Sequence, residues 1–375
     1  MTIRDAISLP LTLGLSKGGR RLTSPLPTPP IIDAMRVSEI GEFGLIKLLA
    51  AEFGIEYPPS RAATRRGLLV DLGDDAVVTR RNDGALIWTT DTLVAGEHFL
   101  PERTPWESAG WKALAVNLSD IAAMGGTPHL ALVTLALPPD FCVEDAQALY
   151  AGLRQAADVY GVTLGGGDIV RAPVFSITVA LSGWASLSPT GEPRVLARTA
   201  ARVGDVVAVT GSLGDSAGGL RLLGEGAAFD RTEQAVLREA HERPRPPVHC
   251  GLLAVRAGVR CGIDISDGLV QDLGHIARAS GAGIRIDAAR LPVSDALREL
   301  YPGYAAGLAL TGGEDYQLAL VGARAAIEAL LEAGECDLTE IGEVVPYDEP
   351  RVAVVDETGR EIPLGSGGWD HFASP

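Results

Sequence analysis

Six short acidic stretches recur along the chain between residues 73 and 315, most of them with glycine close by. They are Gly73-Asp74-Asp75, Thr90-Asp91, Asn117-Leu118-Ser119-Asp120, Gly167-Asp168, Asp264-Ile265-Ser266-Asp267 and Gly313-Glu314-Asp315. A single Asp beside a turn usually caps nearby backbone N–H groups, but this many exceed what folding requires. Carboxylates gathered in one place repel each other unless cations neutralise them. The fold is therefore expected to bring several of these stretches to one cation-filled site.

The apolar patterns place these stretches between alternating strands and helices. Strands are expected at 85–88, 129–137, 175–184 and 205–211, and strand–turn–strand units at 68–78 and 308–320. Helices are expected at 39–49, 106–124 and 143–160, the last closed by Gly161, with two more after the glycine-rich stretches 214–219 and 262–268. The alternation predicts an α/β or α+β protein.

The polar residues Thr89, Thr90 and Asp91 follow an apolar run from Ala85 to Trp88, so a strand is expected to end there and a loop to begin. Two hydroxyls and a carboxylate are hard oxygen ligands of the kind that Mg²⁺ takes. A capping turn is the alternative for this stretch alone. Magnesium usually comes with substrate phosphates, and glycines let backbone N–H groups approach phosphate oxygens. The set of stretches therefore predicts phosphoryl transfer with several metal ions.

Composition excludes several classes of protein. A formal charge of −16 argues against a nucleic-acid partner, and no apolar run approaches the roughly 20 residues of a membrane helix. The four cysteines, Cys142, Cys250, Cys261 and Cys336, contain no CxxC pair. This favours a reduced, cytoplasmic protein over a disulfide framework or a zinc site.

The 375 residues are long enough for two domains. Residues 1–36 are expected to be a disordered extension, because a basic cluster and a proline-rich linker replace any apolar pattern, and Met35 is a candidate start. A boundary is expected near residues 189–201, where Pro, Gly and Arg interrupt the pattern. It divides the chain into two domains, at 37–190 and 191–375.

The chain lacks a GxxxxGK[ST] loop and a kinase-type GxGxxG with its catalytic loop. Its stretches resemble the thiamine-monophosphate kinase family, of the superfamily that includes aminoimidazole ribonucleotide synthetase, from about Val37 to the end. The marks of the resemblance are Gly41-Glu42-Phe43, Gly73 to Ala76, Thr90 to Gly96 with His98-Phe99, Lys112 to Gly125, Gly166-Gly167-Asp168, Asp264 to His275 and Gly312 to Tyr316. The chain departs from the family pattern at Ile169 to Ala172, and at Trp369, where Tyr or Phe is also common.

The resemblance implies a two-domain fold like that of aminoimidazole ribonucleotide synthetase. The N-terminal domain at 37–190 would bind ATP and metal ions and would dimerise, with its sheet forming a barrel across a homodimer. The C-terminal α/β domain at 191–375 would complete the active site. It implies ATP-dependent phosphorylation of thiamine monophosphate to thiamine diphosphate by in-line transfer, assisted by several Mg²⁺ ions. The vitamin phosphate and ATP are then the small-molecule partners.

Carried over by position, the resemblance implies four groups of site residues. Catalytic residues are Asp91, Asp120 and Asp267; metal ligands are Asp75, Thr89, Thr90, Asp91, Asp120, Asp168, Asp264 and Asp267; ATP contacts are Tyr160, Gly167, Arg198 and Ser266; substrate contacts are His98, Glu314 and Trp369. Simpler alternatives are a helix cap for Asp267, a core position for Tyr160, an ordinary half-buried role for His98, and an anchor for the C-terminal tail in Trp369.

Other functions stay open at this point. A relative within the superfamily could act on another substrate, such as formylglycinamidine ribonucleotide. A hydrogenase-maturation relative needs a C-terminal cysteine and a selenide-activating relative needs a reactive Cys or selenocysteine near the start, whereas this chain ends in Ser374-Pro375 and has its first cysteine at Cys142. A Ca²⁺-binding structural protein is disfavoured by the absence of a DxDxDG loop.

Overall fold

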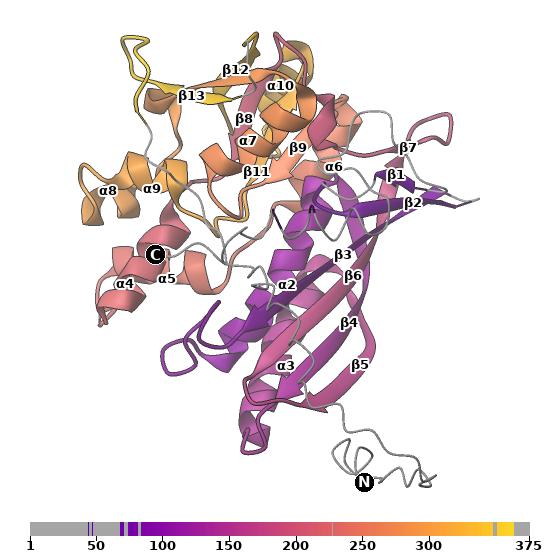
Figure 1. The fold of residues 1–375 in the computed structure, drawn as a ribbon, viewed down its shortest axis with the longest axis vertical. Helices are drawn as coiled ribbons and strands as arrows, with labels where there is room; N and C mark the ends of the chain where they lie inside the picture. The colour runs from indigo at the N-terminus through magenta and orange to yellow at the C-terminus, as the bar shows by residue number, and fades with distance from the viewer. Residues whose placement is uncertain are drawn as a thin grey trace, which may run out of the picture.

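The computed structural model describes residues 68–70, 74–81, 84–226, 228–347 and 351–363, together with Gly44 and Lys47. Two β-sheets with helices packed against them occupy the lower and upper parts of Figure 1. Gly44 and Lys47 are helical, and the rest of the helix expected at 39–49 lies outside the described residues. The predicted extension at 1–36 and the predicted substrate contact Trp369 also lie outside them.

The first sheet has the strand order β1-β2-β3-β6-β4-β5, and β7 pairs with β6. Only β4 and β5 run parallel among these described strands. The strands are β1 (Leu68–Val70), β2 (Val77–Arg81), β3 (Gly84–Val94), β4 (Gly126–Leu137), β5 (Thr163–Arg171), β6 (Ser176–Leu187) and β7 (Pro193–Arg194).

Two long helices, α2 (Trp106–Ala123) and α3 (Val143–Tyr160), pack on one face of this sheet. The α2 helix is buried at almost every position from Ser108 to Ala123. Its close packing on α3 requires glycine, because a Cβ at Gly110 would lie 1.9 Å from the carbonyl oxygen of Leu149. The α3 helix ends at Gly161 in the left-handed conformation, as its sequence predicts.

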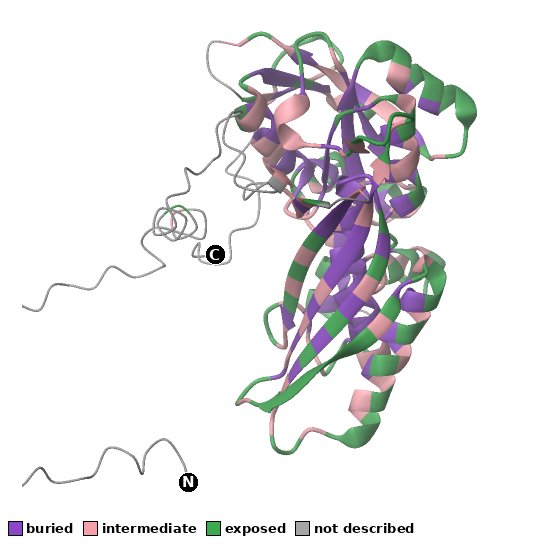
Figure 2. Cartoon of the chain, turned by 90° about the vertical axis from the view of Figure 1, so that its right-hand side faces the viewer, coloured by how far each residue is buried: buried purple, intermediate pink, exposed green. Residues whose placement is uncertain are grey.

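The other face of the first sheet carries exposed side chains. Along β3 and β4, buried and exposed positions alternate, as the banding of the long strands in Figure 2 shows. Large apolar side chains are among the exposed ones, with Trp88 exposed by 45% and Leu132 by 47%. Exposed apolar patches on a sheet face indicate an interaction surface.

The second sheet has the order β13-β10-β12-β8-β11-β9. Its strands are β8 (Val206–Thr210), β9 (Cys261–Asp264), β10 (Gly283–Asp287), β11 (Leu318–Gly322), β12 (Leu338–Val345) and β13 (Val352–Val355). The associated helices are η2 (Arg198–Ala200), α4 (Asp215–Glu225), α5 (Thr232–Glu242), α6 (Val248–Ala257), α7 (Leu269–Ser280), η3 (Ala288–Arg290), α8 (Asp295–Leu300), α9 (Ala305–Thr311) and α10 (Arg324–Ala333). The mixed α and β content agrees with the predicted class, whereas the described strands form no closed barrel within one chain.

The two halves are joined through a shared hydrophobic core. Leu118 of α2 belongs to the same buried cluster as Val206 of β8 and Leu318 of β11. The α6 helix packs on the end of α2, where a Cβ at Gly251 would lie 2.2 Å from the carbonyl oxygen of Ala122. The predicted division of the chain near residue 190 stays a prediction.

Two of the secondary-structure predictions near the site are wrong. The strand expected to end at Trp88 continues through Thr89, Thr90 and Asp91 to Val94, because this segment pairs residue by residue with β6. Thr89 to Thr92 are all polar, and threonine, which fills three of these four positions, favours strands. The segment 308–311, expected to be a strand, belongs to the α9 helix. A short run of Ala and Leu fits either element, and both residues favour helices.

The prediction of reduced cysteines is also wrong, for one pair. Cys250 in α6 and Cys336, just after α10, form a disulfide with their Cα atoms 5.6 Å apart. The two residues are separated by 86 positions, and only the packing of α10 on α6 brings them together. Cys142 and Cys261 are free thiols.

Candidate active site

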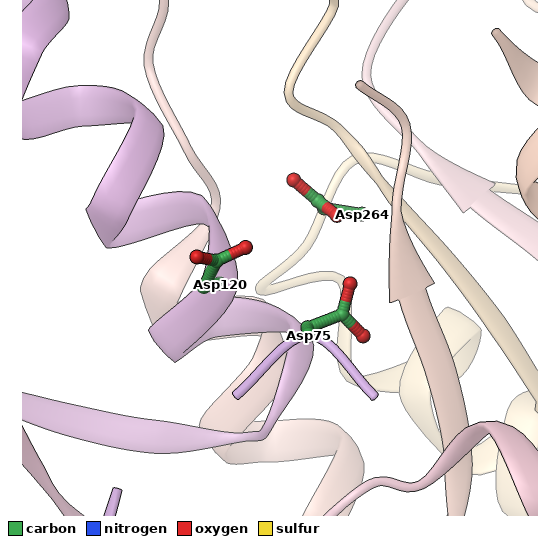
Figure 3. A group of neighbouring side chains, drawn as sticks. All are labelled: Asp75, Asp120 and Asp264. Carbon is green, nitrogen blue, oxygen red and sulfur yellow. The ribbon is translucent and has the colours of Figure 1, made fainter. Parts of the chain in front are cut away.

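Three aspartates from distant parts of the chain converge between the two sheets. Asp75 precedes β2, Asp120 lies in the last turn of α2, and Asp264 ends β9. Each contributes a carboxylate oxygen within 4.8 Å of those of the other two. Their carboxylates face the same space in Figure 3. The predicted convergence of the acidic stretches is thus found for these three.

The electrostatics of this cluster are those of a site suited to cations. Burial raises the pKa of Asp120 well above its ordinary value, and the charges of Asp91, Asp264 and Asp75 raise it further. Burial and Asp75 likewise raise the pKa of Asp264 well above 3.8, and burial raises that of Asp91. A bound cation would relieve this repulsion, and an all-oxygen donor set matches Mg²⁺ better than softer metals.

Hydrogen bonds and one arginine hold the cluster in place. The Ser119 hydroxyl donates to Asp264 Oδ2 at 2.7 Å, and the Thr89 hydroxyl donates to Asp120. Arg198 Nη2 lies 2.7 Å from Asp75 Oδ1, and its backbone N–H donates to Asp74 at 3.0 Å. The predicted ATP contact Arg198 therefore lies at the cluster, where it pairs with a carboxylate.

A cavity of about 640 Å³ opens beside the cluster. It is bordered by eight of the predicted site residues: Thr90, Asp91, His98, Asp120, Asp264, Ser266, Asp267 and Glu314. Asp75, Thr89 and Arg198 adjoin it through their contacts with the cluster. Most of the predicted site is thus brought together within one chain.

Gly167 and Asp168 do not reach the cavity in a single chain. They lie in β5, the edge strand, and both are exposed. The pairing register places Asp168 in one row across the sheet with Thr134 of β4, Thr178 of β6 and Thr92 of β3. Asp168 is therefore three strands away from β3. Three strand spacings amount to roughly 14 Å, far beyond the reach of a shared metal ion. Because Thr92 and Thr134 are exposed, Asp168 shares their open sheet face, whereas Thr89 points to α2.

Tyr160 is likewise absent from the lining of the cavity. It ends α3 and packs edge-on against Trp111, with ring centroids 6.4 Å apart. Burial raises the pKa of its hydroxyl to about 12. The position of Tyr160 within a single chain therefore fits the alternative that it is a core residue.

The loop that carries Ser266 and Asp267 is fixed by a residue that the sequence analysis missed. The carboxylate of Asp272, in the first turn of α7, accepts hydrogen bonds from the backbone N–H groups of Ser266, Asp267 and Gly268, each at 3.1 Å. The N-cap of α7 is Gly268, without a side-chain cap. Asp267 is thus not the N-cap of α7. Its carboxylate instead accepts a hydrogen bond from the side-chain amide of Gln271.

His98 and Glu314 also border the cavity. Nδ1 of His98 accepts a hydrogen bond from the backbone N–H of Val94 at 3.1 Å, so in the neutral ring Nε2 carries the proton. Glu314 lies within 2.6 Å of Lys112 Nζ and 3.4 Å of His241 Nδ1. Lys112 and His241 were not predicted as site residues. A sequence signal exists for Lys112, the only charged residue in the apolar run 109–116.

The comparisons with known proteins place this architecture in a class. The family model of the AIR synthase related protein N-terminal domain matches residues 73–185, and that of the C-terminal domain matches residues 202–355. Two mixed sheets with an acidic cavity between them are thus the fold of an AIR synthase related protein.

Relatives within that class are more specific. Thiamine-monophosphate kinase of Escherichia coli K12 is 40% identical over 343 residues, which cover 89% of this chain and 99% of the relative. The Aquifex aeolicus enzyme of the same name is 35% identical, with 90% and 100% covered. The structure "AaThiL complexed with AMPPCP and TMP" has a TM-score of 0.78 at 34% identity, with 90% of this chain and 99% of that chain covered. The chain belongs to the thiamine-monophosphate kinase family.

Among the described helices, none is long and apolar enough to cross a membrane.

Proposed function

We propose that this protein transfers the γ-phosphate of ATP to thiamine monophosphate, forming thiamine diphosphate. The observation that carries the proposal is a single cavity that is lined both by Asp120 and Asp264 of the acidic cluster and by Glu314 and His98. Its relatives carry the name of this activity, and one of them has been solved with AMPPCP and TMP.

The reaction demands positioning and neutralisation of charge more than a strong base. An oxygen of the acceptor phosphate forms a bond to the γ-phosphorus while the bond from that phosphorus to the ADP oxygen breaks, and ADP takes the electron pair. Both reactants are anions, so they repel as they approach. The attacking group is already a phosphate oxygen, so no side chain has to remove a proton from it.

The carboxylates fit the Mg²⁺ ions that such a reaction uses, because burial and mutual repulsion raise the pKa values of Asp120 and Asp264. When bound, Mg²⁺ would neutralise phosphate charge and hold the reacting groups in line. The residues proposed to hold it are Asp75, Thr89, Thr90, Asp91, Asp120, Asp168, Asp264 and Asp267. Asp91, Asp120 and Asp267 are proposed as the catalytic members, since all three border the cavity.

The remaining contacts are divided between the two substrates. Ser266 and Arg198 are proposed to bind ATP. To do so, Arg198 gives up part of its ion pair with Asp75 and binds the polyphosphate instead. Tyr160 and Gly167 complete the proposed ATP contacts. His98 and Glu314 are proposed to bind the vitamin together with Trp369, whose side chain lies outside the described residues.

The proposed assembly is a homodimer formed through the open face of the first sheet, with a barrel built from the strands of both subunits. Trp88 and Leu132 on this face are exposed by 45% and 47%, which suits burial against a second copy. Asp168 shares this face and lies far from its own cavity. A dimer would give Gly167 and Asp168 access to the cavity of the partner. The cytoplasmic location stays a prediction.

The test is an ADP-release assay with ATP, Mg²⁺ and one acceptor at a time. Thiamine monophosphate should support turnover, whereas thiamine, which lacks the attacking phosphate, and formylglycinamidine ribonucleotide should not. The Asp120→Asn protein is the matched control for contaminating kinases, since it loses a carboxylate of the cluster. Turnover with formylglycinamidine ribonucleotide alone would assign the chain to a different reaction of the same superfamily.

A further inference from the structure

A buried lysine lies directly behind Glu314. Lys112 is only 1% exposed in the middle of α2, and its Nζ lies 2.6 Å from Glu314 Oε1. Lys112 does not border the cavity, whereas Glu314 does, with 27% of its side chain exposed. An ammonium group this deeply buried is costly unless an anion pairs with it. The pair therefore fixes the positions of both groups.

The backbone of Glu314 is also held in an unusual conformation. Its φ of 65° lies in the left-handed region, which is unfavourable for a residue with a side chain. The Glu314 N–H donates to the carbonyl oxygen of Ser266 at 2.7 Å. A Cβ at Gly313 would lie 2.7 Å from that same oxygen, so the loop and the Ser266 segment are in close contact. Main-chain contacts thus fix where the side chain starts, and Lys112 fixes where it ends.

His241 provides a second, neutral contact. Its Nδ1 lies 3.4 Å from Glu314 Oε2 and 3.0 Å from the Ser216 hydroxyl. Burial and the neighbouring Lys112 charge lower the pKa of His241 to about 3, so the ring is neutral. Its Nδ1 faces both the Glu314 carboxylate and the Ser216 hydroxyl, so His241 adds a polar, uncharged neighbour to Glu314.

Lys112, 2.6 Å away, is the charged group that pairs with Glu314. Burial raises the pKa of Glu314, but the charge and hydrogen bond of Lys112, together with contributions from His241 and His98, outweigh burial and lower it. Glu314 is ionised at neutral pH and presents an acceptor to the cavity. Lys112 and Asp120 are eight residues apart in α2, roughly 12 Å along its axis.

We propose that Lys112 is a positioning residue for the acceptor substrate: it fixes Glu314 as an ionised acceptor that selects organic phosphates carrying a cationic or amine-bearing ring. The inference rests on the proposed function, because it assigns the acceptor to the Glu314 region and the nucleotide to the acidic cluster. Lys112 itself touches neither substrate and acts through Glu314.

The test compares Lys112→Met, Glu314→Gln and the double variant with the wild-type protein in the ADP-release assay. Methionine keeps the length of lysine without its charge. Lys112→Met should raise KM for thiamine monophosphate by about tenfold or more, while KM for ATP stays within about twofold. An equal rise in both KM values, or no change in the first, would overturn the inference. Absence of turnover by the wild-type protein with thiamine monophosphate would instead refute the proposed function, and this inference with it.

The double variant separates positioning from general destabilisation. Replacing both members of a buried ion pair by groups of similar volume is often tolerated, so Lys112→Met/Glu314→Gln should fold even if Lys112→Met does not. If Lys112 acts through Glu314, the double variant should have the same KM for thiamine monophosphate as Glu314→Gln alone. A further loss in the double variant would show that Lys112 acts by another route and would overturn the inference.

Discussion

The Ser119 hydroxyl donates a 2.7 Å hydrogen bond to the carboxylate of Asp264 and so links α2 to the end of β9. Asp120, the next residue of α2, shares the acidic cluster with Asp264. One turn of a helix in the first half of the chain therefore sets the position of a strand end in the second half. The cluster exists only while the two halves keep this contact.

Ser119→Ala should weaken both the contact and the reaction. Loss of a buried hydrogen bond to a carboxylate should lower the free energy of unfolding by about 1–3 kcal/mol and allow Asp264 to move within the cluster. We expect kcat at saturating Mg²⁺ to fall by roughly tenfold. Urea denaturation and steady-state kinetics measure the two effects. Ser108→Ala, at another buried serine of α2, is the matched control and should leave kcat unchanged. Equal kinetics for both variants would separate Ser119 from the site.

Asp91→Asn keeps the shape of the side chain and removes one charge from the cavity. Asp91 borders the cavity and interacts with Asp120. If it helps to hold the metal ions, kcat should fall by at least about a hundredfold, since each ~1.4 kcal/mol of lost transition-state stabilisation is tenfold. Circular dichroism should show an intact fold. The exposed Asp140→Asn is the charge-matched control. Near-normal turnover of Asp91→Asn at saturating Mg²⁺ would remove Asp91 from the catalytic set.

The stability of the metal-free protein should depend on pH in a defined direction. Burial, followed by neighbouring carboxylates, raises the pKa values of Asp120 and Asp264 well above 3.8. An acid with a raised pKa keeps its proton longer in the folded state, so its contribution favours folding at low pH and is lost as pH rises from 3.8 toward the folded pKa. If Mg²⁺ binds at the cluster as proposed, it replaces these protons. The increase in Tm that it causes should therefore be larger at about pH 8 than at about pH 5.5.

Thermal unfolding with EDTA and with excess Mg²⁺ at each pH measures this increase. Comparing the two curves at one pH cancels the titration of groups remote from the cluster. Asp264→Asn should reduce the increase at the higher pH, because it removes one of the three converging carboxylates. An increase in Tm that is the same at both pH values would show that Mg²⁺ does not compete with protons at this cluster.

Local signals in the sequence predict the fold best where one residue decides the outcome. The α3 helix is predicted to both ends, because an apolar face is followed by Gly161, which adopts the left-handed conformation. The end of β3 is not predictable in this way. Thr89 to Val94 continue the strand only because β6 provides a partner for each residue. Long-range pairing thus overrides the local change from apolar to polar residues.

The same distinction applies to the site. Asp75, Asp120 and Asp264 can be named from the sequence because acidic residues beside turns are conspicuous, but their convergence depends on how the two sheets meet. Lys112 is conspicuous as a lone charge in the apolar run 109–116, but its partner Glu314, 2.6 Å away, is remote in the sequence. Cys250 and Cys336 show no pairing signal, since 86 residues separate them. Contacts between segments that are remote in the sequence cannot be predicted from the local sequence pattern.

The position of Asp168 predicts that active sites are shared between two subunits. Asp168 lies on the open sheet face, three strands from Asp91, so in the proposed dimer it would serve the partner's cavity. Asp91→Asn and Asp168→Asn should each be inactive alone. Co-expressed with different affinity tags and purified as a heterodimer, they should recover roughly half of the wild-type kcat per dimer, because one of the two sites then contains both native aspartates. Each tagged homodimer, carried through the same purification, is the control.

A heterodimer as inactive as either homodimer would show that Asp168 serves its own chain or none. A purely monomeric protein in sedimentation experiments would exclude the shared site outright.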